Sequence, residues 1–222
     1  MKKKAVIAID GPAGAGKTSI AKIVSRKLGY NYIDTGAMYR AISWKAFREK
    51  IELKAKKDLI KMVKNTKIEL KNKDGMVRVH LDGKDVTNKI RSKRLAEKAS
   101  ILATIPEVRE QLMKIQRRLG SSGGIVVEGR DIGTVVFPRA DYKFYLDASI
   151  KERALRRYRE LKAKGEEGEL AELEKAIRSR DKRDRTRGVA PLKIAPDAIV
   201  IDSTDMSKKE VVEFILKRIQ RN

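Results

Sequence analysis

The chain has 222 residues, no cysteine and a single histidine, His80. Disulfide frameworks, thiolate metal sites, cysteine nucleophiles and multi-histidine metal sites are therefore excluded, and the composition suits a reducing compartment. The 53 Lys and Arg residues against 30 Asp and Glu residues give a formal net charge of +23, which attracts anionic ligands. No apolar run approaches the roughly 20 residues that span a bilayer, so we expect a cytoplasmic protein without a membrane partner.

The high charge has two interpretations. A charged fraction of 37% is typical of a solvated, ion-pair-rich surface, whereas the excess of basic residues also suits nucleic acid. Segment 45–98 alone carries 18 basic and 8 acidic residues, or +10 of the +23. Aromatic residues make up only 5%, and no basic run is interleaved with aromatics that would stack bases. We therefore favour the solvated surface.

The first third of the chain alternates strands and helices. In chain order the sequence predicts a strand at 5–10, a glycine loop at 11–16, a helix that Gly29 ends, a strand at 30–34, a turn at Thr35-Gly36, a helix from Ala37 and another near 59–63. This order is typical of an α/β domain with a parallel sheet.

Residues 67–91 break this rhythm. Their alternating apolar residues, with turns at 72–75 and Asp82-Gly83, predict an antiparallel hairpin or ribbon inserted beside the main sheet. A helix is expected at about 92–103. The pattern Thr104-Ile-Pro-Glu107 is a capping box, which predicts that the next helix begins there and runs to Leu119.

The remaining strands and helices follow the same logic. Strands are predicted at 125–129, 142–147 and 198–202, so the main sheet has five strands. Capping boxes at Ser149–Glu152 and Ser207–Glu210 begin two helices, of which the first runs through Leu161. Residues 162–175 are almost wholly charged or small and predict a mobile, solvated segment, followed by a helix to about Arg187.

One glycine loop carries the clearest chemical signal. Residues 11–18 match G-x-x-x-x-G-K-[ST] between a predicted strand and a predicted helix, as a phosphate-binding loop requires. Lys17 would reach the β and γ phosphates, and the Thr18 hydroxyl would bind Mg²⁺. The expected ATP-binding residues are Gly11, Pro12, Ala13, Gly14, Ala15, Gly16, Lys17, Thr18 and Ser19. Neither N-K-x-D nor D-x-x-G occurs, which leaves kinases and ATPases.

Three motifs place arginines near this loop. Asp34-Thr-Gly-Ala-Met-Tyr-Arg40 and Glu128-Gly-Arg-Asp-Ile-Gly133 each follow a predicted strand, and ligands of open α/β sheets bind where parallel strands end. A third motif, Arg178-Ser-Arg-Asp-Lys-Arg-Asp-Arg-Thr-Arg187, concentrates basic residues that repel each other unless anions lie between them. Separately, the first two motifs are equally compatible with an exposed helix charge and a structural ion pair, and a solvated helix is the usual explanation for the third.

Together with the late VAPLKIAPDAIVIDST, these motifs resemble the bacterial cytidylate kinase family in order and over essentially the whole chain. The resemblance implies a P-loop three-layer α/β/α core with a five-stranded parallel sheet, formed by 1–36, 120–156 and 188–222. It also implies a nucleoside-monophosphate-binding domain at 37–119 with the small antiparallel ribbon at about 67–91, and a helical lid at 157–187. The implied reaction transfers a phosphoryl group from ATP, with Mg²⁺, to CMP or dCMP.

The resemblance also assigns roles to residues of this sequence. Arg40 and Arg130 are expected to hold the CMP phosphate, because a guanidinium fork matches phosphate geometry. Ser100, Arg109, Asp131 and Arg187 match positions that contact cytosine, Arg180 and Asp184 match positions near the ribose, and Thr35 and Tyr39 complete the CMP-binding set. The catalytic set is Lys17, Arg40, Arg130 and Arg157. For Arg157, contact with the transferring phosphates is as well supported as ion pairing with Glu152 and Glu160.

This chain departs from the family pattern at two positions. Thr35 stands where serine is frequent and keeps the hydroxyl, while Glu128 replaces an aspartate, which puts its water-mediated contact to Mg²⁺ in question. His80 has no acidic or histidine neighbours at metal spacing and is interpreted as structural.

Two other functions remain open from the residues. A P-loop kinase with another acceptor, such as UMP, AMP or an alcohol for which Asp131 would be the base, would keep the same fold. A nucleic-acid-binding protein would use the +10 segment instead. We expect a monomer with no nucleic-acid partner, since most helices carry charge on both faces.

Overall fold

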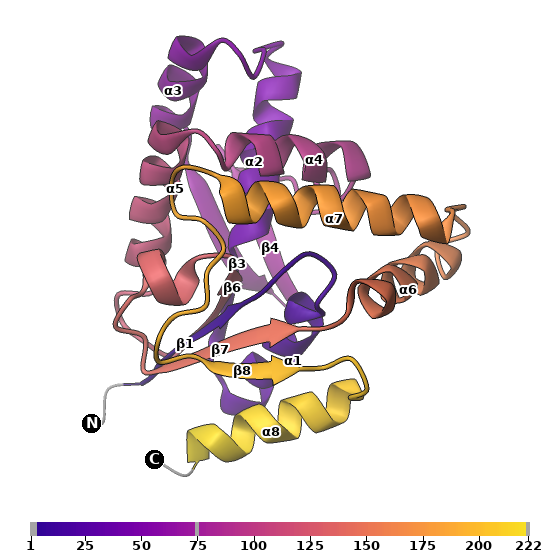
Figure 1. Cartoon of the computed structure of the whole chain (residues 1–222). Coiled ribbons are helices and arrows are strands. Elements are labelled where there is room, and N and C mark those ends of the chain that lie inside the picture. Colours follow the sequence, from indigo (N-terminus) through magenta and orange to yellow (C-terminus); the bar gives the residue numbers. More distant parts are fainter. Residues whose placement is uncertain (1–3, 74–75, 221–222) are drawn as a thin grey trace.

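The structure is a computed structural model that describes residues 4–73 and 76–220. Its main sheet has the order β2-β6-β1-β7-β8, and all neighbouring strands are parallel. The strands are β1 (Val6–Asp10), β2 (Asn31–Asp34), β6 (Ile125–Gly129), β7 (Tyr142–Asp147) and β8 (Ile199–Asp202). The five-stranded parallel sheet predicted from the sequence is therefore confirmed (Figure 1).

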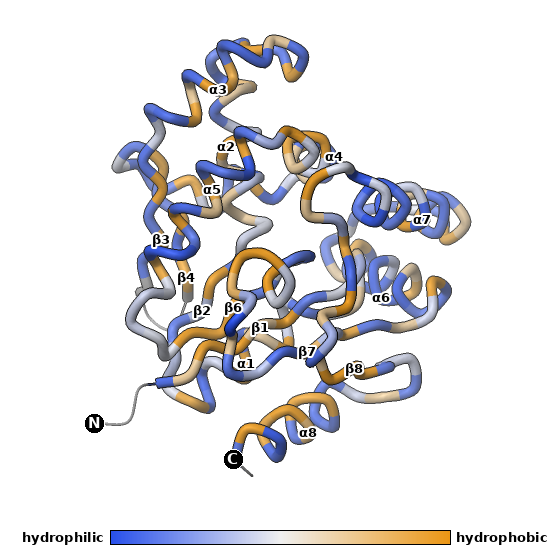
Figure 2. The backbone as a smooth tube through the Cα atoms, turned by 60° about the vertical axis from the view of Figure 1, so that its left-hand side comes forward, coloured by the Kyte–Doolittle hydropathy of each residue, from blue (hydrophilic) through white to orange (hydrophobic). Residues whose placement is uncertain are grey.

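Helices cover both faces of this sheet. Ile7 and Ile9 of β1 pack toward α1 (Lys17–Leu28) and α8 (Lys208–Gln220), whereas Ala8 between them packs toward α5 (Pro106–Leu119) and the short helix η1 (Ile132–Val136). Because successive strand residues point to opposite faces, a strand buried on both faces must be continuously apolar. Figure 2 shows hydrophobic colour along β1, β6 and β7. The predicted three-layer α/β/α arrangement is correct.

A second group of elements is inserted in the sequence between β2 and β6. It contains α2 (Thr35–Arg48), α3 (Lys56–Lys64), α4 (Lys93–Leu102), α5 and the antiparallel sheet β3 (Ile68–Lys73), β4 (Met76–Leu81) and β5 (Lys84–Asp85). These elements share their own hydrophobic core, centred on fully buried residues such as Met38, Leu59 and Leu112. The predicted ribbon is confirmed, and Asp82-Gly83 forms a turn as expected. The predicted turn at 72–75 includes residues 74–75, which lie outside the described residues.

Two predicted helix starts are wrong. Thr35 and Gly36 do not form a turn but begin α2, because the Asp34 carboxylate accepts the Ala37 amide at 2.8 Å and caps the helix. The helix predicted from Thr104 begins at Pro106, after Ile105 at the cap position. Proline suits the first helical position, and the Thr104 hydroxyl instead donates to the Ile101 carbonyl of the preceding turn at 2.7 Å. The boxes at Ser149 and Ser207 do cap their helices.

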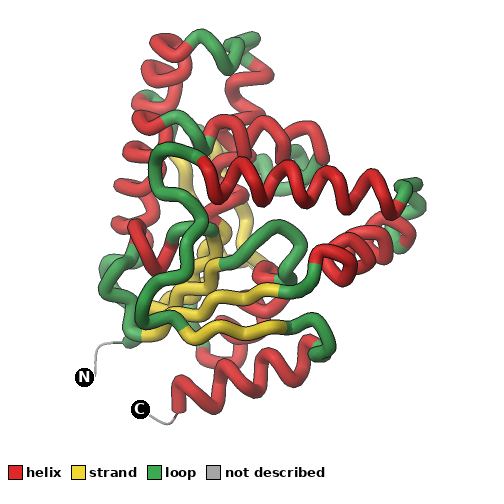
Figure 3. The backbone as a smooth tube through the Cα atoms, in the orientation of Figure 1, coloured by secondary structure: helices red, strands yellow, loops and turns green. Residues whose placement is uncertain are grey.

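The charged stretch 162–175 is only partly a loop. Helix α6 (Ile150–Lys162) and helix α7 (Leu170–Thr186) form a hairpin, so the last residues of that stretch are already helical. Leu161, Leu173 and Ile177 pack together between the two helices. Most of residues 162–175 are exposed, as expected, but the helix that was expected to follow them already begins at Leu170, and Lys162 still belongs to α6. Figure 3 shows both helices of this hairpin beside the carboxyl ends of the strands.

Candidate active site

The glycine loop wraps the carboxyl end of β1 and leads into α1. Gly11, Gly14 and Gly16 have φ angles of 147°, 78° and 90°, in the region that favours glycine. A Cβ at Gly11 would lie 1.9 Å from the Leu146 carbonyl oxygen, so a side chain there has no room. The sequence motif thus folds as a strand, a tight loop and a helix N-terminus, the geometry in which backbone N–H groups bind phosphate.

Lys17 lies inside this loop. Its side chain is buried, and its Nζ donates to the Pro12 carbonyl at 2.5 Å. Burial and the nearby Arg130 guanidinium lower the pKa of Lys17, while Glu128 and Asp10 oppose that shift. An amine held in a cationic environment is well suited to an anionic ligand.

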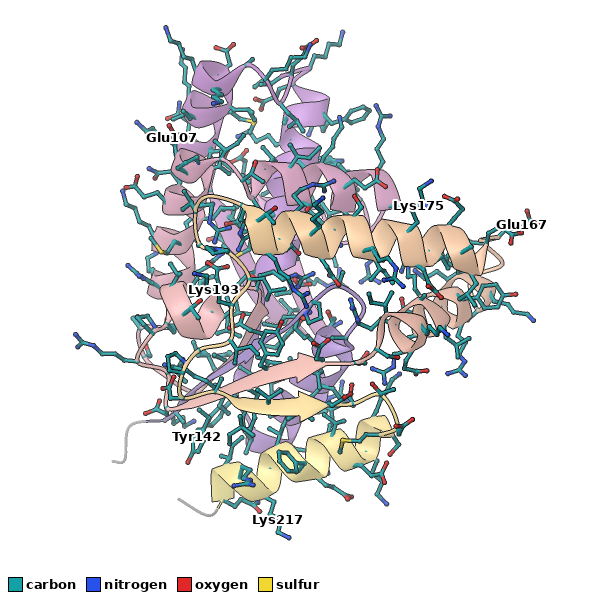
Figure 4. The ribbon with its side chains drawn as sticks, viewed as in Figure 1. Glu107, Tyr142, Glu167, Lys175, Lys193 and Lys217 are labelled. Atoms are coloured by element: carbon teal, nitrogen blue, oxygen red, sulfur yellow. The ribbon has the colours of Figure 1, made fainter. Side chains whose placement is uncertain are left out.

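A group of arginines faces Lys17 from other elements. Arg130, after β6, donates from Nε to Asp184 Oδ2 of α7 at 2.8 Å, and Arg40 of α2 pairs with Asp34 at 3.0 Å. The Nε of Arg180 is buried and has no hydrogen-bond partner among the described residues. Burial, followed by repulsion from Arg130, lowers the pKa of Arg180 to about 10. Figure 4 shows side-chain nitrogens gathered along the side of α7 that faces the sheet. Phosphate oxygens between these groups would relieve their repulsion.

A second cluster is centred on Asp131. Its carboxylate accepts hydrogen bonds from Arg109 of α5 and, at 3.2 Å, from Arg187 after α7. Arg109 also donates to the Ala103 carbonyl at 3.1 Å and lies over the Tyr39 ring, 5.9 Å from its centroid. Burial raises the pKa of Tyr39 to about 12. The structure thus brings together four of the residues that the sequence assigned to the CMP base and its surroundings.

The other predicted site residues border these clusters. Ser100 of α4 is buried and accepts a hydrogen bond from Arg183 at 3.1 Å, and the Thr35 hydroxyl donates to the Glu128 carbonyl at 2.7 Å. Arg157 is the exception. It forms an ion pair with Glu160 at 3.0 Å and its side chain is 35% exposed, so its contact with phosphates stays a prediction.

Glu128 is buried at the end of β6, where the Tyr32 hydroxyl donates to its Oε1. Burial and the Asp34 charge raise the pKa of Glu128, and Lys17, Tyr32 and Thr18 oppose the rise. No group of three His, Cys, Asp or Glu side chains suited to a metal occurs in the described ranges. A Thr18 hydroxyl with one nearby carboxylate still fits Mg²⁺, which usually keeps several waters and takes one or two protein oxygens besides phosphate.

Sequence reasoning missed two residues that hold the glycine loop and a third that joins β1 to the segment after β6. Arg153 of α6 is 3% exposed and donates to the Ala13 carbonyl at 2.9 Å and to Asp181 at 2.5 Å, while Asp181 accepts the Ala13 amide at 3.0 Å. The third is Asp10, whose carboxylate accepts two backbone amides of the loop after β6. The available signals were weak: Asp10 is a charged residue at the end of an apolar strand, and Arg153 belongs to a basic run near the start of a helix.

The fold and this site define a class, a P-loop phosphotransferase in which clustered arginines lie beside the glycine loop. The family model described as cytidylate kinase matches residues 7–221. A cytidylate kinase of Caldanaerobacter subterraneus subsp. tengcongensis is 49% identical over 216 residues, covering 97% of this chain and 95% of the relative. A cytidylate kinase of a Geobacillus species is 48% identical over 217 residues, covering 98% and 97%. The chain belongs to the cytidylate kinase family and is an ATP-dependent phosphotransferase that phosphorylates CMP.

The fold also occurs in a more distant structure. A solved but uncharacterised protein from Eubacterium ventriosum aligns with a TM-score of 0.53 at 14% identity, covering 99% of this chain and all of that one. This similarity concerns the fold alone. No helix in the described part of the chain combines the length and apolarity that a membrane crossing needs.

Proposed function

We propose that ATP occupies the glycine loop and that the phosphate of CMP or dCMP occupies the arginine cluster, so that the γ-phosphoryl group passes directly to a CMP phosphate oxygen. The products are ADP and CDP or dCDP. The observation that carries this proposal is that two cationic groups lie at the carboxyl ends of neighbouring strands: Lys17 at the start of α1 after β1, and Arg130 directly after β6.

The acceptor is already an anion, so the reaction needs no strong general base. Catalysis then depends on alignment and on neutralising charge in a loose transition state. Lys17 would contact the β and γ phosphates, and Arg40 and Arg130 would hold the acceptor phosphate in line. The loop residues Gly11, Pro12, Ala13, Gly14, Ala15, Gly16, Thr18 and Ser19 would surround the ATP phosphates.

The cytidine moiety would lie between the two halves of the site. Asp131, Arg109, Arg187 and Ser100 would contact the base, with Thr35 and Tyr39 beside them, while Arg180 and Asp184 would contact the sugar. Asp131 is held by two arginines, so its carboxylate is fixed in orientation before a base arrives. Such a preorganised polar pocket rejects a base with mismatched donors and acceptors, because buried polar groups would be left unpaired.

Bound Mg²⁺ would supply charge neutralisation on the β and γ phosphates. Thr18 would hold the ion directly, and Glu128 would act through water. The Tyr32 hydroxyl donates to the Glu128 carboxylate, and this hydrogen bond would hold the carboxylate beside Thr18 and Lys17.

The rest of the proposal concerns organisation. Residues 37–119 would form the acceptor domain and 157–187 a lid that excludes water from the γ-phosphoryl group, although residue 157 lies inside α6. The protein would act as a monomer in the cytoplasm, without a nucleic-acid partner.

The test is coupled ADP release with Mg²⁺ and ATP and a panel of CMP, dCMP, UMP, AMP and GMP. We expect CMP and dCMP to lead the panel, and turnover to collapse in Lys17→Ala and Arg187→Ala. Faster turnover of another acceptor would refute the cytosine assignments while leaving the donor site intact.

A further inference from the structure

Asp10 is a buried carboxylate that none of the roles above uses. It is the last residue of β1 and is 5% exposed. Its Oδ1 accepts the Ile132 amide at 2.9 Å and its Oδ2 accepts the Gly133 amide at 2.7 Å. Both carboxylate oxygens are therefore directed at the backbone of one segment, 122 residues further along the chain.

That segment carries the acceptor site. Arg130 and Asp131, which immediately precede Ile132, provide the proposed phosphate and base contacts. The segment also has little free space, because a Cβ at Gly129 would lie 2.6 Å from the Ile132 side chain and one at Gly133 would lie 3.1 Å from Lys143. A shift of its backbone would therefore move both functional side chains.

The other end of the link is the donor site. Asp10 is followed directly by Gly11, where a Cβ would lie 1.9 Å from the Leu146 carbonyl oxygen. The backbone of Asp10 is paired with Gly129 on one side and with Tyr145 on the other. Its side chain thus connects the start of the nucleotide loop to the acceptor segment, across two neighbouring strands.

Burying a carboxylate is costly, and an apolar residue would continue the pattern of β1 without that cost. We propose that Asp10 is a positioning residue that fixes the spacing between the ATP loop and the Arg130–Asp131 segment, and so aligns donor and acceptor phosphates. A misplacement of reacting groups by about 1 Å can lower the rate about 100-fold, so the two hydrogen bonds of Asp10 can strongly affect catalysis. This inference rests on the proposed acceptor role of that segment.

The direct test is a ligand that spans both sites, adenosine and cytidine joined by five phosphates. The affinities for this analogue, for ATP alone and for CMP alone are measured in the wild type, in Asp10→Asn and in Asp141→Asn. Asn keeps the shape of Asp10 but places an N–H donor opposite a backbone N–H. Asp141 is a matched control, because its carboxylate accepts the Val6 amide at the opposite end of the same strand, at 2.7 Å.

For Asp10→Asn we expect a loss of analogue affinity about 10-fold greater than the product of the two single-nucleotide losses, and a fall in kcat of about 10- to 100-fold at saturating substrates. Asp141→Asn should match the wild type. Gly133→Ala, whose Cβ would press on the Lys143 side chain beside the Asp10 contact, displaces the same segment from the acceptor side. It should lower the affinity for the analogue in the same way and provides the test if Asp10→Asn does not fold. An analogue loss equal to the product of the single losses would overturn the inference.

The proposed function is judged separately in the same experiment. If the wild type does not bind or phosphorylate CMP, the acceptor assignment fails. If the wild type binds and phosphorylates CMP, but Asp10→Asn and Gly133→Ala keep the wild-type ratio of analogue affinity to the affinities for ATP and CMP, only the role of Asp10 fails.

Discussion

Arg183 of α7 donates a hydrogen bond to the Ser100 hydroxyl of α4 at 3.1 Å. This contact joins the α6–α7 hairpin to the inserted domain directly, on the side of the site where the cytosine is proposed to bind. The Ser100 hydroxyl is therefore already oriented by the protein before a nucleotide binds.

Replacing Ser100 by Ala should weaken the binding of CMP without affecting the binding of ATP. A net hydrogen bond contributes about 1–1.5 kcal/mol, so we expect the KM for CMP to rise about 5- to 10-fold. Arg183→Met, which leaves the hydroxyl in place, should have a smaller effect. Steady-state kinetics with each substrate varied in turn measures this, and an equal rise in both KM values would contradict the base-contact role.

Arg130→Met should reduce both activity and stability. Removing the phosphate contact should lower kcat/KM for CMP by about 100-fold or more. It also leaves Asp184, whose side chain is 5% exposed, without its ion pair, and breaking a buried pair in this way costs about 3–5 kcal/mol. Kinetics and urea unfolding measure the two effects, and Arg130→Met with unchanged stability would show that the Asp184 pair is not maintained in solution.

Lys17→Met should stabilise the fold while abolishing turnover. Lys17 is buried beside Arg130 and Arg180, and burial lowers its pKa, so its charged form is held at a cost. Active-site groups of this kind commonly trade stability for function. We expect a higher Tm by differential scanning calorimetry without nucleotide, together with a loss of ADP release. A lower Tm would mean that the bond to the Pro12 carbonyl outweighs the charge repulsion.

The pH dependence of stability should identify Asp10. Burial raises its pKa to about 6 from an ordinary value of 3.8, with Asp131 adding to the rise and Lys17 and the Gly133 and Ile132 amides opposing it. The folded state therefore binds this proton more tightly than the unfolded state. Protonation of Asp10 thus contributes to the free energy of unfolding below pH 4, and this stabilisation is lost as the pH rises through 6.

Relative to Asp10→Asn, the wild type should lose about 2 kcal/mol of unfolding free energy between pH 4 and pH 7. Urea unfolding of both proteins across this range provides the comparison. A constant difference between them would show that the pKa of Asp10 is not raised.

Arg153 and Arg157 are two arginines of α6 whose ion pairs differ in burial, so their variants can be compared. Arg153→Met removes the partner of Asp181, whose side chain is 7% exposed, and should destabilise the protein by about 3–5 kcal/mol. Arg157→Ala breaks an exposed pair with Glu160 and should change stability by less than about 1 kcal/mol. Activity assays of Arg157→Ala then test its contact with phosphates independently of folding, and an unchanged kcat would refute that role.

The sequence predicts those features that depend on neighbours along the chain. The glycine loop, the strand before it and the helix after it are local, as are the serine caps at Ser149 and Ser207. Where two local signals compete, pattern alone fails. At Thr104 the capping box competes with Pro106, and the fixed φ of proline determines the helix start.

Contacts between distant segments are beyond such reasoning. Asp10 and Ile132, or Arg153, Asp181 and Ala13, meet only once the sheet and the hairpin have formed. Leu173 looks isolated among charged residues because its apolar partners, such as Leu161, lie on the opposite helix. The resemblance to a family supplied the site residues that local patterns could not.

The α6–α7 hairpin has a rigid attachment rather than a loose one. Its helices are packed on each other, and the buried Arg153–Asp181 pair clamps both sides of the Ala13 peptide. Glu167, labelled in Figure 4, lies in the loop that joins α6 to α7 at the outer end of the hairpin. A displacement of the hairpin would therefore shift the Ala13 backbone, in the loop that is proposed to bind the ATP phosphates.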